Sequence, residues 1–139
     1  MKVTGACHCR NIQFTAEVDP SHVVLCHCTD CQTLSGSAFR VNAPAAFDSF
    51  KLSCGQPKTY EKVAESGSKR VHGFCGDCGT PLYSVALVGA TLIFLRMGAI
   101  HERHLLRPAL QIWRRSTVPW LNDLDAIPGS PEQQALAAK

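Results

Sequence analysis

The sequence contains no long hydrophobic run, and this absence argues against a membrane-spanning helix. Its most apolar stretch, residues 83–95, is interrupted by Gly89 and is shorter than the about 20 residues that a bilayer requires. The first residues contain no apolar segment of the kind found in secretory signals. We therefore expect a cytoplasmic protein that has no membrane partner.

Runs of charge are also missing. Charged residues make up 18% of the chain, the formal net charge is +3, and lysine and arginine never form a block longer than two residues. Such scattered charge is not typical of a nucleic-acid-binding tail, so we expect no nucleic-acid partner. Hydrophobic residues make up 45% of the 139 residues, as in a globular domain. We expect one domain over residues 1–125 and a C-terminal tail over residues 126–139.

Helical periodicity is scarce, whereas short strand patterns bounded by glycine and proline are frequent. We expect a hairpin about Ser66-Gly67-Ser68, one short helical turn over residues 31–36 and a frayed helix over residues 132–139. Strands are expected over residues 11–18, 22–25, 38–41, 50–52, 59–63, 69–74, 91–97 and 110–113. The apolar stretch over residues 83–95 is expected to form two strands joined at a turn. The pattern predicts an all-β fold that contains little helix.

Seven of the eight cysteines fall into three tight clusters. The clusters are Cys7 with Cys9, then Cys26 with Cys28 and Cys31, and finally Cys75 with Cys78. An even number of cysteines also fits a disulfide framework, but cysteines two residues apart on an extended segment rarely satisfy disulfide geometry with each other. In a cytosolic protein, paired spacing of this kind favours metal binding.

The spacing divides the seven sulfurs into four and three. Residues 75–79 resemble a zinc knuckle, which supplies half of a closed four-ligand site, and the pair Cys7 and Cys9 is its natural complement. The remaining triplet comes from one short segment and can hold a second metal ion. Because a catalytic zinc keeps one position open, three ligands are typical of a site that does chemistry.

The histidines within the clusters are poor candidate ligands. On an extended strand, His8 and His27 point away from the sulfurs on either side of them, so we expect them in solvent or beside a group that they orient. A fourth ligand from Asp30, His27, Cys54 or a distant residue would instead close the second site and make it inert. Cys54 stands alone, which is more typical of a small side chain that is buried or partly buried than of a ligand.

Five segments, taken in order, carry a family resemblance: Gly5–Cys9, Cys26–Cys31, Ser35-Gly36, Phe74–Leu82 and Pro119-Trp120-Leu121. They resemble the glutathione-dependent formaldehyde-activating enzyme family, which also includes the zinc domain of centromere protein V. The resemblance implies a β-tent of small antiparallel sheets stapled by zinc, with two zinc ions per chain and the second ion open to exchange. By the same resemblance, the structural zinc ligands are Cys7, Cys9, Cys75 and Cys78, and the ligands of the catalytic-type zinc are Cys26, Cys28 and Cys31.

The resemblance also implies an activity. The family's namesake reaction joins glutathione and formaldehyde, which is a carbon–sulfur lyase reaction run in the synthetic direction. The expected partners are therefore glutathione, or a similar thiol, and a small aldehyde. The alternative is a non-catalytic zinc-binding domain that binds a partner or a thiol. Two positions depart from the family pattern, because Arg10 stands where glycine is common and Gln111 stands where many members have histidine.

Four arginines are candidates to pair with the carboxylates of glutathione. They are Arg40, Arg96, Arg114 and Arg115. Because charged side chains are rarely buried, we expect each of them to lie in solvent.

Overall fold

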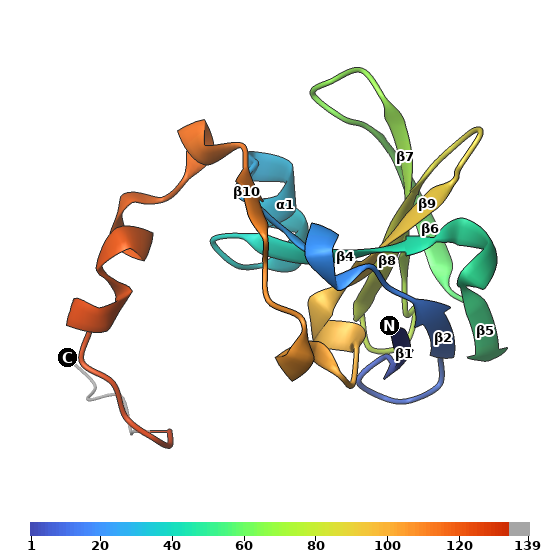
Figure 1. Cartoon of the computed structure of the whole chain (residues 1–139), viewed down its shortest axis with the longest axis horizontal. Coiled ribbons are helices and arrows are strands. Elements are labelled where there is room, and N and C mark those ends of the chain that lie inside the picture. The colour runs from blue at the N-terminus through green and yellow to red at the C-terminus, as the bar shows by residue number, and fades with distance from the viewer. Residues whose placement is uncertain (134–139) are drawn as a thin grey trace.

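The computed structural model describes residues 1–133 and has a mainly β fold, which confirms the predicted fold class. Within that range, ten strands form two sheets (Figure 1). The smaller sheet has the order β1-β2-β5, and the larger has the order β10-β3-β4-β9-β8-β7-β6. The strands are β1 (Lys2–Ala6), β2 (Gln13–Glu17), β3 (Val24–Cys26), β4 (Arg40–Ala46), β5 (Lys51–Cys54), β6 (Lys58–Val63), β7 (Lys69–Phe74), β8 (Pro81–Ala86), β9 (Leu92–Arg96) and β10 (Leu110–Ile112).

Neighbouring strands pair antiparallel, with one exception among the described residues. β10 runs parallel to β3, and its Ile112 lies opposite Cys26 at the edge of the larger sheet. The predicted hairpin is confirmed as β6 and β7, which turn at Gly67 with a positive φ of 83°. Each predicted strand range overlaps an observed strand, whereas β1 was not predicted.

The main hydrophobic core is formed by both sheets together. On β1 and β2, alternate side chains are buried, as a half-covered sheet requires. The ring centroids of Phe14 and Phe50 lie 5.5 Å apart, and those of Phe50 and Tyr83 lie 5.3 Å apart, so an aromatic row connects the two sheets. Other members of the same core are Val3, Ala16, Ala43, Ala45, Leu82, Ile93, Leu95 and Ile100.

The opposite face of the larger sheet carries polar and charged side chains. Successive residues of a strand point to opposite faces, so Ala43 on β4 enters the core while Asn42 points the other way. The strand register places Arg40 opposite Cys26, and Asn42 opposite Arg96. Directly opposed residues project from the same face of a sheet, so these four side chains share one surface.

The described helices are short. α1 (Thr29–Ser35) follows β3 and ends at Gly36, whose φ of 64° provides a left-handed cap, close to the helical turn predicted over residues 31–36. The remaining helices are 3₁₀ segments, of which η6 has a kink at Asp123: η1 (Pro20–His22), η2 (Phe47–Ser49), η3 (Met97–Ala99), η4 (Arg103–Leu105), η5 (Arg114–Ser116) and η6 (Pro119–Ala126). Within residues 1–133, every helix falls short of the length and hydrophobicity that a bilayer crossing demands.

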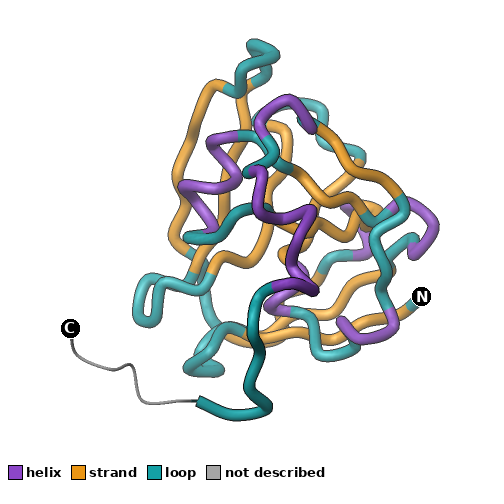
Figure 2. The backbone as a smooth tube through the Cα atoms, turned by 90° about the vertical axis from the view of Figure 1, so that its left-hand side faces the viewer, coloured by secondary structure: helices purple, strands orange, loops and turns teal. Residues whose placement is uncertain are grey.

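The C-terminal segment leaves the sheets after β10 and runs along the outside of the molecule, as Figure 1 and Figure 2 show from two sides. It exposes Trp120, Leu124 and Ile127. The division into a domain over residues 1–125 and a tail stays a prediction. Most of the helix predicted over residues 132–139 lies outside the described residues.

We predict that Leu82→Ala destabilises the fold by about 2–5 kcal/mol, because this fully buried side chain would leave a cavity in the core. Urea unfolding followed by circular dichroism measures the change. Leu105→Ala is the matched control, since Leu105 is 59% exposed and should change the free energy of unfolding by less than about 0.5 kcal/mol. Equal effects of the two substitutions would contradict the core described above.

Candidate metal centres

Two groups of cysteine sulfurs come together in space, and each could hold a metal ion. The first group contains Cys7, Cys9, Cys75 and Cys78, and the second contains Cys26, Cys28 and Cys31. Within each group, all the sulfur atoms lie within 4.8 Å of one another. The spatial grouping thus follows the division into four and three that the spacing predicts.

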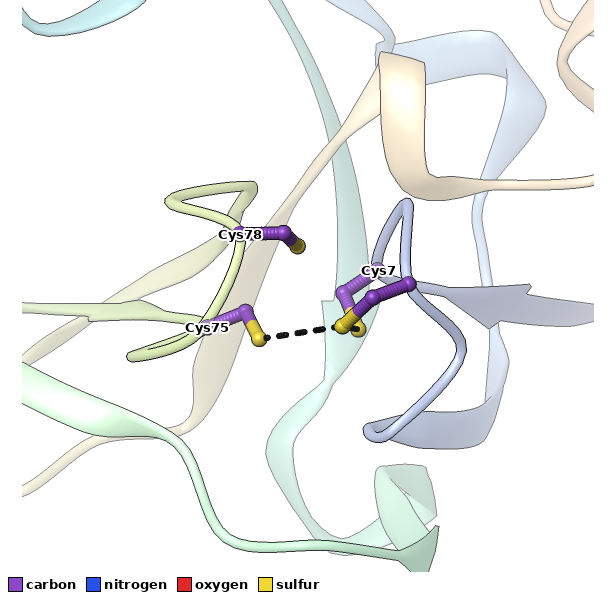
Figure 3. A group of neighbouring side chains, drawn as sticks. Cys7, Cys75 and Cys78 are labelled. Atoms are coloured by element: carbon purple, nitrogen blue, oxygen red, sulfur yellow. Dashed lines mark hydrogen bonds between the residues drawn. The ribbon is translucent and has the colours of Figure 1, made fainter.

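The four-sulfur group is built from two turns that face each other. Figure 3 shows Cys75 and Cys78 on one turn, with Cys7 on the opposite turn. The Sγ atoms of Cys7 and Cys9 are 3.5 Å apart, and those of Cys9 and Cys75 are 3.7 Å apart. Because Cys7 follows β1 and Cys75 follows β7, the group joins the smaller sheet to the larger one.

The two turns have matching backbone hydrogen bonds. The Arg10 amide donates to the Cys7 carbonyl, and the Gly79 amide donates to the Cys75 carbonyl, each at 2.9 Å. Both donors have left-handed backbone, with φ of 66° at Arg10 and 74° at Gly79. Glycine adopts this conformation readily, whereas an L residue with a side chain, such as Arg10, adopts it at some cost.

The extended conformation expected for residues 7–9 is wrong. β1 ends at Ala6, and His8 and Cys9 form a turn that brings both sulfurs toward the same partner turn. His8 is exposed, and its amide donates to Thr80 Oγ1 at 3.0 Å. Between the turns, Asn11 Nδ2 donates to Asp77 Oδ2 at 3.0 Å. The turns are therefore held together by hydrogen bonds as well as by the proximity of their sulfurs.

The three-sulfur group lies where β3 passes into α1. Cys26 is the last residue of β3, Cys28 is the N-cap of α1, and Cys31 lies in its first turn. Cys28 Sγ accepts the Cys31 amide at 3.3 Å. Hydrogen bonding to Cys31 lowers the pKa of Cys26, whereas hydrogen bonding to Cys26 raises the pKa of Cys31. Because metal ligation needs thiolates, occupancy of this group would release protons.

His27 is buried behind this group, with 2% of its surface exposed. Its Nε2 lies 2.8 Å from Gln111 Oε1, and its carbonyl accepts Gln32 Nε2 at 2.7 Å. The histidine is thus outside the sulfur group and in contact with β10. This is the orienting position that was one of the two expectations for it.

Two of the candidate fourth ligands lie elsewhere. The Asp30 carboxylate forms an ion pair with Lys62, and Cys54 is exposed at the end of β5. Among the histidine, cysteine and acidic residues of the described chain, only the three cysteines share this group. The expectation that Cys54 is a buried or partly buried side chain is wrong, because it lies on a strand whose four residues are all exposed.

A cavity of about 320 Å³ opens beside the three-sulfur group, which lines it. The polar face of the larger sheet forms its floor. Other lining residues are Val24, Arg40, Asn42, Lys62, Ala64, Ser66, Ser68, Arg70, His72, Ser84, Phe94, Arg96, Ile112 and Trp113. Cys28 also lines a neighbouring cavity of about 420 Å³ that shares Lys62 and Trp113.

The expectation that all four candidate arginines lie in solvent is wrong for two of them. Arg40 and Arg96 are 5% and 6% exposed, whereas Arg114 and Arg115 are exposed. Burial, together with the nearby charge of Arg40, lowers the pKa of Arg96 to about 9. The two arginines are buried because the strand register directs both side chains into the cavity beside the sulfurs.

Three further residues of this cavity were missed by the sequence analysis. They are Lys62, Arg70 and His72, all from the β6–β7 hairpin. A signal for them exists, because Arg70 and His72 alternate with Val71 and so share one face of β7. Alternation alone does not tell that this polar face borders a cavity rather than open solvent.

Comparison with known proteins places the chain in a family. The model of the family described as glutathione-dependent formaldehyde-activating enzyme matches residues 2–116. A search of the curated proteins found no match. A crystal structure of a Rhodobacter sphaeroides protein from a structural genomics programme is similar, with a TM-score of 0.61, 16% identity and coverage of 78% of this chain and 98% of that one. This likeness supports the fold alone. The family match covers most of the chain, and the chain belongs to the glutathione-dependent formaldehyde-activating enzyme family.

Proposed function

We propose that the protein is a zinc-dependent carbon–sulfur lyase-type enzyme that joins glutathione, or a similar thiol, to formaldehyde or another small aldehyde. One observation carries the proposal: a group of three cysteine sulfurs, with no fourth ligand among the described residues, lines a cavity. The family match agrees with it. In the reaction, the thiol sulfur bonds to the carbonyl carbon, and the carbonyl oxygen takes up one proton as the thiol loses one.

The chemistry of the donors fits zinc at both groups. Tetrahedral thiolates at about 2.3 Å from zinc lie about 3.8 Å from one another, close to the 3.7 Å between the Cys9 and Cys75 sulfurs. Four thiolates suit a closed structural ion, and three suit an ion with one open position. A zinc ion bound at the open group would lower the pKa of a thiol that binds to it, so that the thiol loses its proton more readily.

The protein's own residues would position the reactants and limit their access to water. The β6–β7 hairpin borders the cavity through Lys62, Ala64 and Ser66. Two ion pairs fasten this hairpin to the other side of the site, since Lys62 pairs with Asp30 on α1 and Glu65 pairs with Arg115 on η5. Such fastening supports a site that holds a small thiol and a small aldehyde in contact.

We predict that Cys28→Ser lowers the catalysed rate of adduct formation by roughly 100-fold or more, because even changes beside a metal ligand cost about 10–100-fold. Exchange NMR of glutathione and formaldehyde measures the rate. Cys54→Ser is the matched control and should leave the rate unchanged, because Cys54 lies outside both groups. If the wild-type protein and Cys28→Ser both show only the uncatalysed rate, the enzyme proposal fails for glutathione with formaldehyde. The proposal is then limited to a different thiol or aldehyde, with the non-catalytic zinc domain as the alternative.

We further predict that the two groups differ in their effect on folding. The double variant Cys75→Ser, Cys78→Ser should lose one zinc per chain and unfold, because structural zinc contributes apparent binding energy of about 10 kcal/mol or more. The double variant Cys26→Ser, Cys31→Ser should lose one zinc and keep its fold. Elemental analysis and thermal circular dichroism measure both properties. Full stability of the first variant would contradict a structural role for the four-sulfur group.

A further inference from the structure

The cavity beside the three-sulfur group carries an excess of positive charge. Arg40, Arg70, Arg96 and Lys62 line it, and no acidic residue of the described chain does. Lys62 is neutralised by Asp30, which lines the neighbouring cavity. The three guanidinium groups, in contrast, form no ion pair with a carboxylate among the described residues.

Arg40 is the least satisfied of the three. Its side chain is 5% exposed, and its Nη1 is buried without a hydrogen-bond partner in the described structure. Guanidinium nitrogens are strong donors, and a charged donor that is buried without a partner destabilises the structure around it. Because Arg40 lies opposite Cys26 on the neighbouring strand, the free donor is close to the three-sulfur group.

Arg96 is held in place by neutral groups. Its guanidinium donates to Asn42 Oδ1 and, at 3.1 Å, to His72 Nδ1. Burial, with the charge of Arg96, lowers the pKa of His72 to about 4, so the imidazole is neutral and accepts this hydrogen bond. These contacts orient Arg96 without neutralising it.

Arg70 completes the row from β7. Its Nη2 donates to Ser84 Oγ at 3.4 Å, and its guanidinium lies 5.1 Å from the centroid of the Phe94 ring. Both contacts leave its charge in place. Arg40, Arg70 and Arg96 all line the same cavity, so their charges lie near one another.

Such a cluster is costly unless an anion binds it, because buried charges without partners lose their hydration. The three-sulfur group offsets part of the charge, since a zinc ion with three thiolates carries a single negative charge. Two guanidinium groups remain in excess. Their planar donors match the geometry of a carboxylate, which can accept two hydrogen bonds from one guanidinium.

We propose that the row of Arg40, Arg70 and Arg96 binds a carboxylate of the thiol substrate while its sulfur lies at the three-cysteine group. This selects small thiols that carry a carboxylate over neutral and cationic thiols. The inference rests on the proposed function, because it takes the three-cysteine group as the place of the sulfur. The cavity of about 320 Å³ lies at the small end of the range of ligand sites.

Calorimetric titration of the zinc-loaded protein tests the inference independently of turnover. The ligands are glutathione, its diethyl ester without free carboxylates, S-methylglutathione without a free thiol, and inorganic phosphate. We expect the ester to bind about tenfold or more weakly than glutathione. Arg70→Gln should weaken glutathione binding by a similar factor, as expected for loss of a charge-assisted hydrogen bond, and leave ester binding unchanged.

A control variant and a second test variant accompany Arg70→Gln. Arg107→Gln removes an exposed arginine outside the cavity and should leave all affinities unchanged. Arg40→Gln should weaken the binding of glutathione and S-methylglutathione alike, since both keep their carboxylates. Circular dichroism verifies that Arg40→Gln keeps its fold. Arg70→Gln allows the same comparison of ligand affinities at a residue that is less buried than Arg40.

Several outcomes overturn the inference. Equal affinity of the wild-type protein for glutathione and its ester does so, as does an equal effect of Arg70→Gln on both ligands. If inorganic phosphate binds as tightly as glutathione, the arginine row is a site for a free anion, and the inference is overturned. Failure to bind any anionic thiol also overturns it. Carboxylate-dependent binding without faster adduct formation upholds the inference and removes only the proposed catalysis.

Discussion

The register of β4 between β3 and β9 is the constraint on which the rest of the molecule depends. On one face of β4, Ala43 and Ala45 complete the core shared by the two sheets. On the other face, Arg40 lies beside Cys26 and Asn42 lies beside Arg96. A shift of one residue would exchange these faces, placing charge in the core and alanine beside the sulfurs. The same pairing therefore maintains both the fold and the site.

The two sulfur groups depend on different kinds of structure. The four-sulfur group lies between turns from two sheets, so its geometry exists only when both sheets have formed. The three-sulfur group comes from one strand end and one helical turn, with Cys28 capping the helix that carries Cys31. Its immediate surroundings, in contrast, are drawn from distant strands of the larger sheet. The two sulfur groups thus have separate supports in a small domain.

Cysteine spacing predicted the sulfurs within each cluster to lie together because residues a few positions apart cannot separate far in space. The two distant pairs were joined only because a closed site needs four ligands. It could not predict the turn at residues 7–9, since spacing does not distinguish a strand from a turn. The strand alternation of Arg40 with Asn42 was readable, yet it marks only a polar face. Whether that face meets solvent or a cavity depends on the β6–β7 hairpin and η5, which are contacts over long distances in the chain. That is why the buried arginines were expected in solvent.

The positions of the two sulfur groups along the chain have a consequence for synthesis. A growing polypeptide emerges from its N-terminus, so the three-sulfur group is complete once Cys31 has left the ribosome. The four-sulfur group must wait for Cys78, and the arginine row must wait for Arg96. A metal ion can therefore meet three thiols on a nascent chain before the cavity beside them exists. During that interval, only the three thiols, and not the finished cavity, would favour one ion over another.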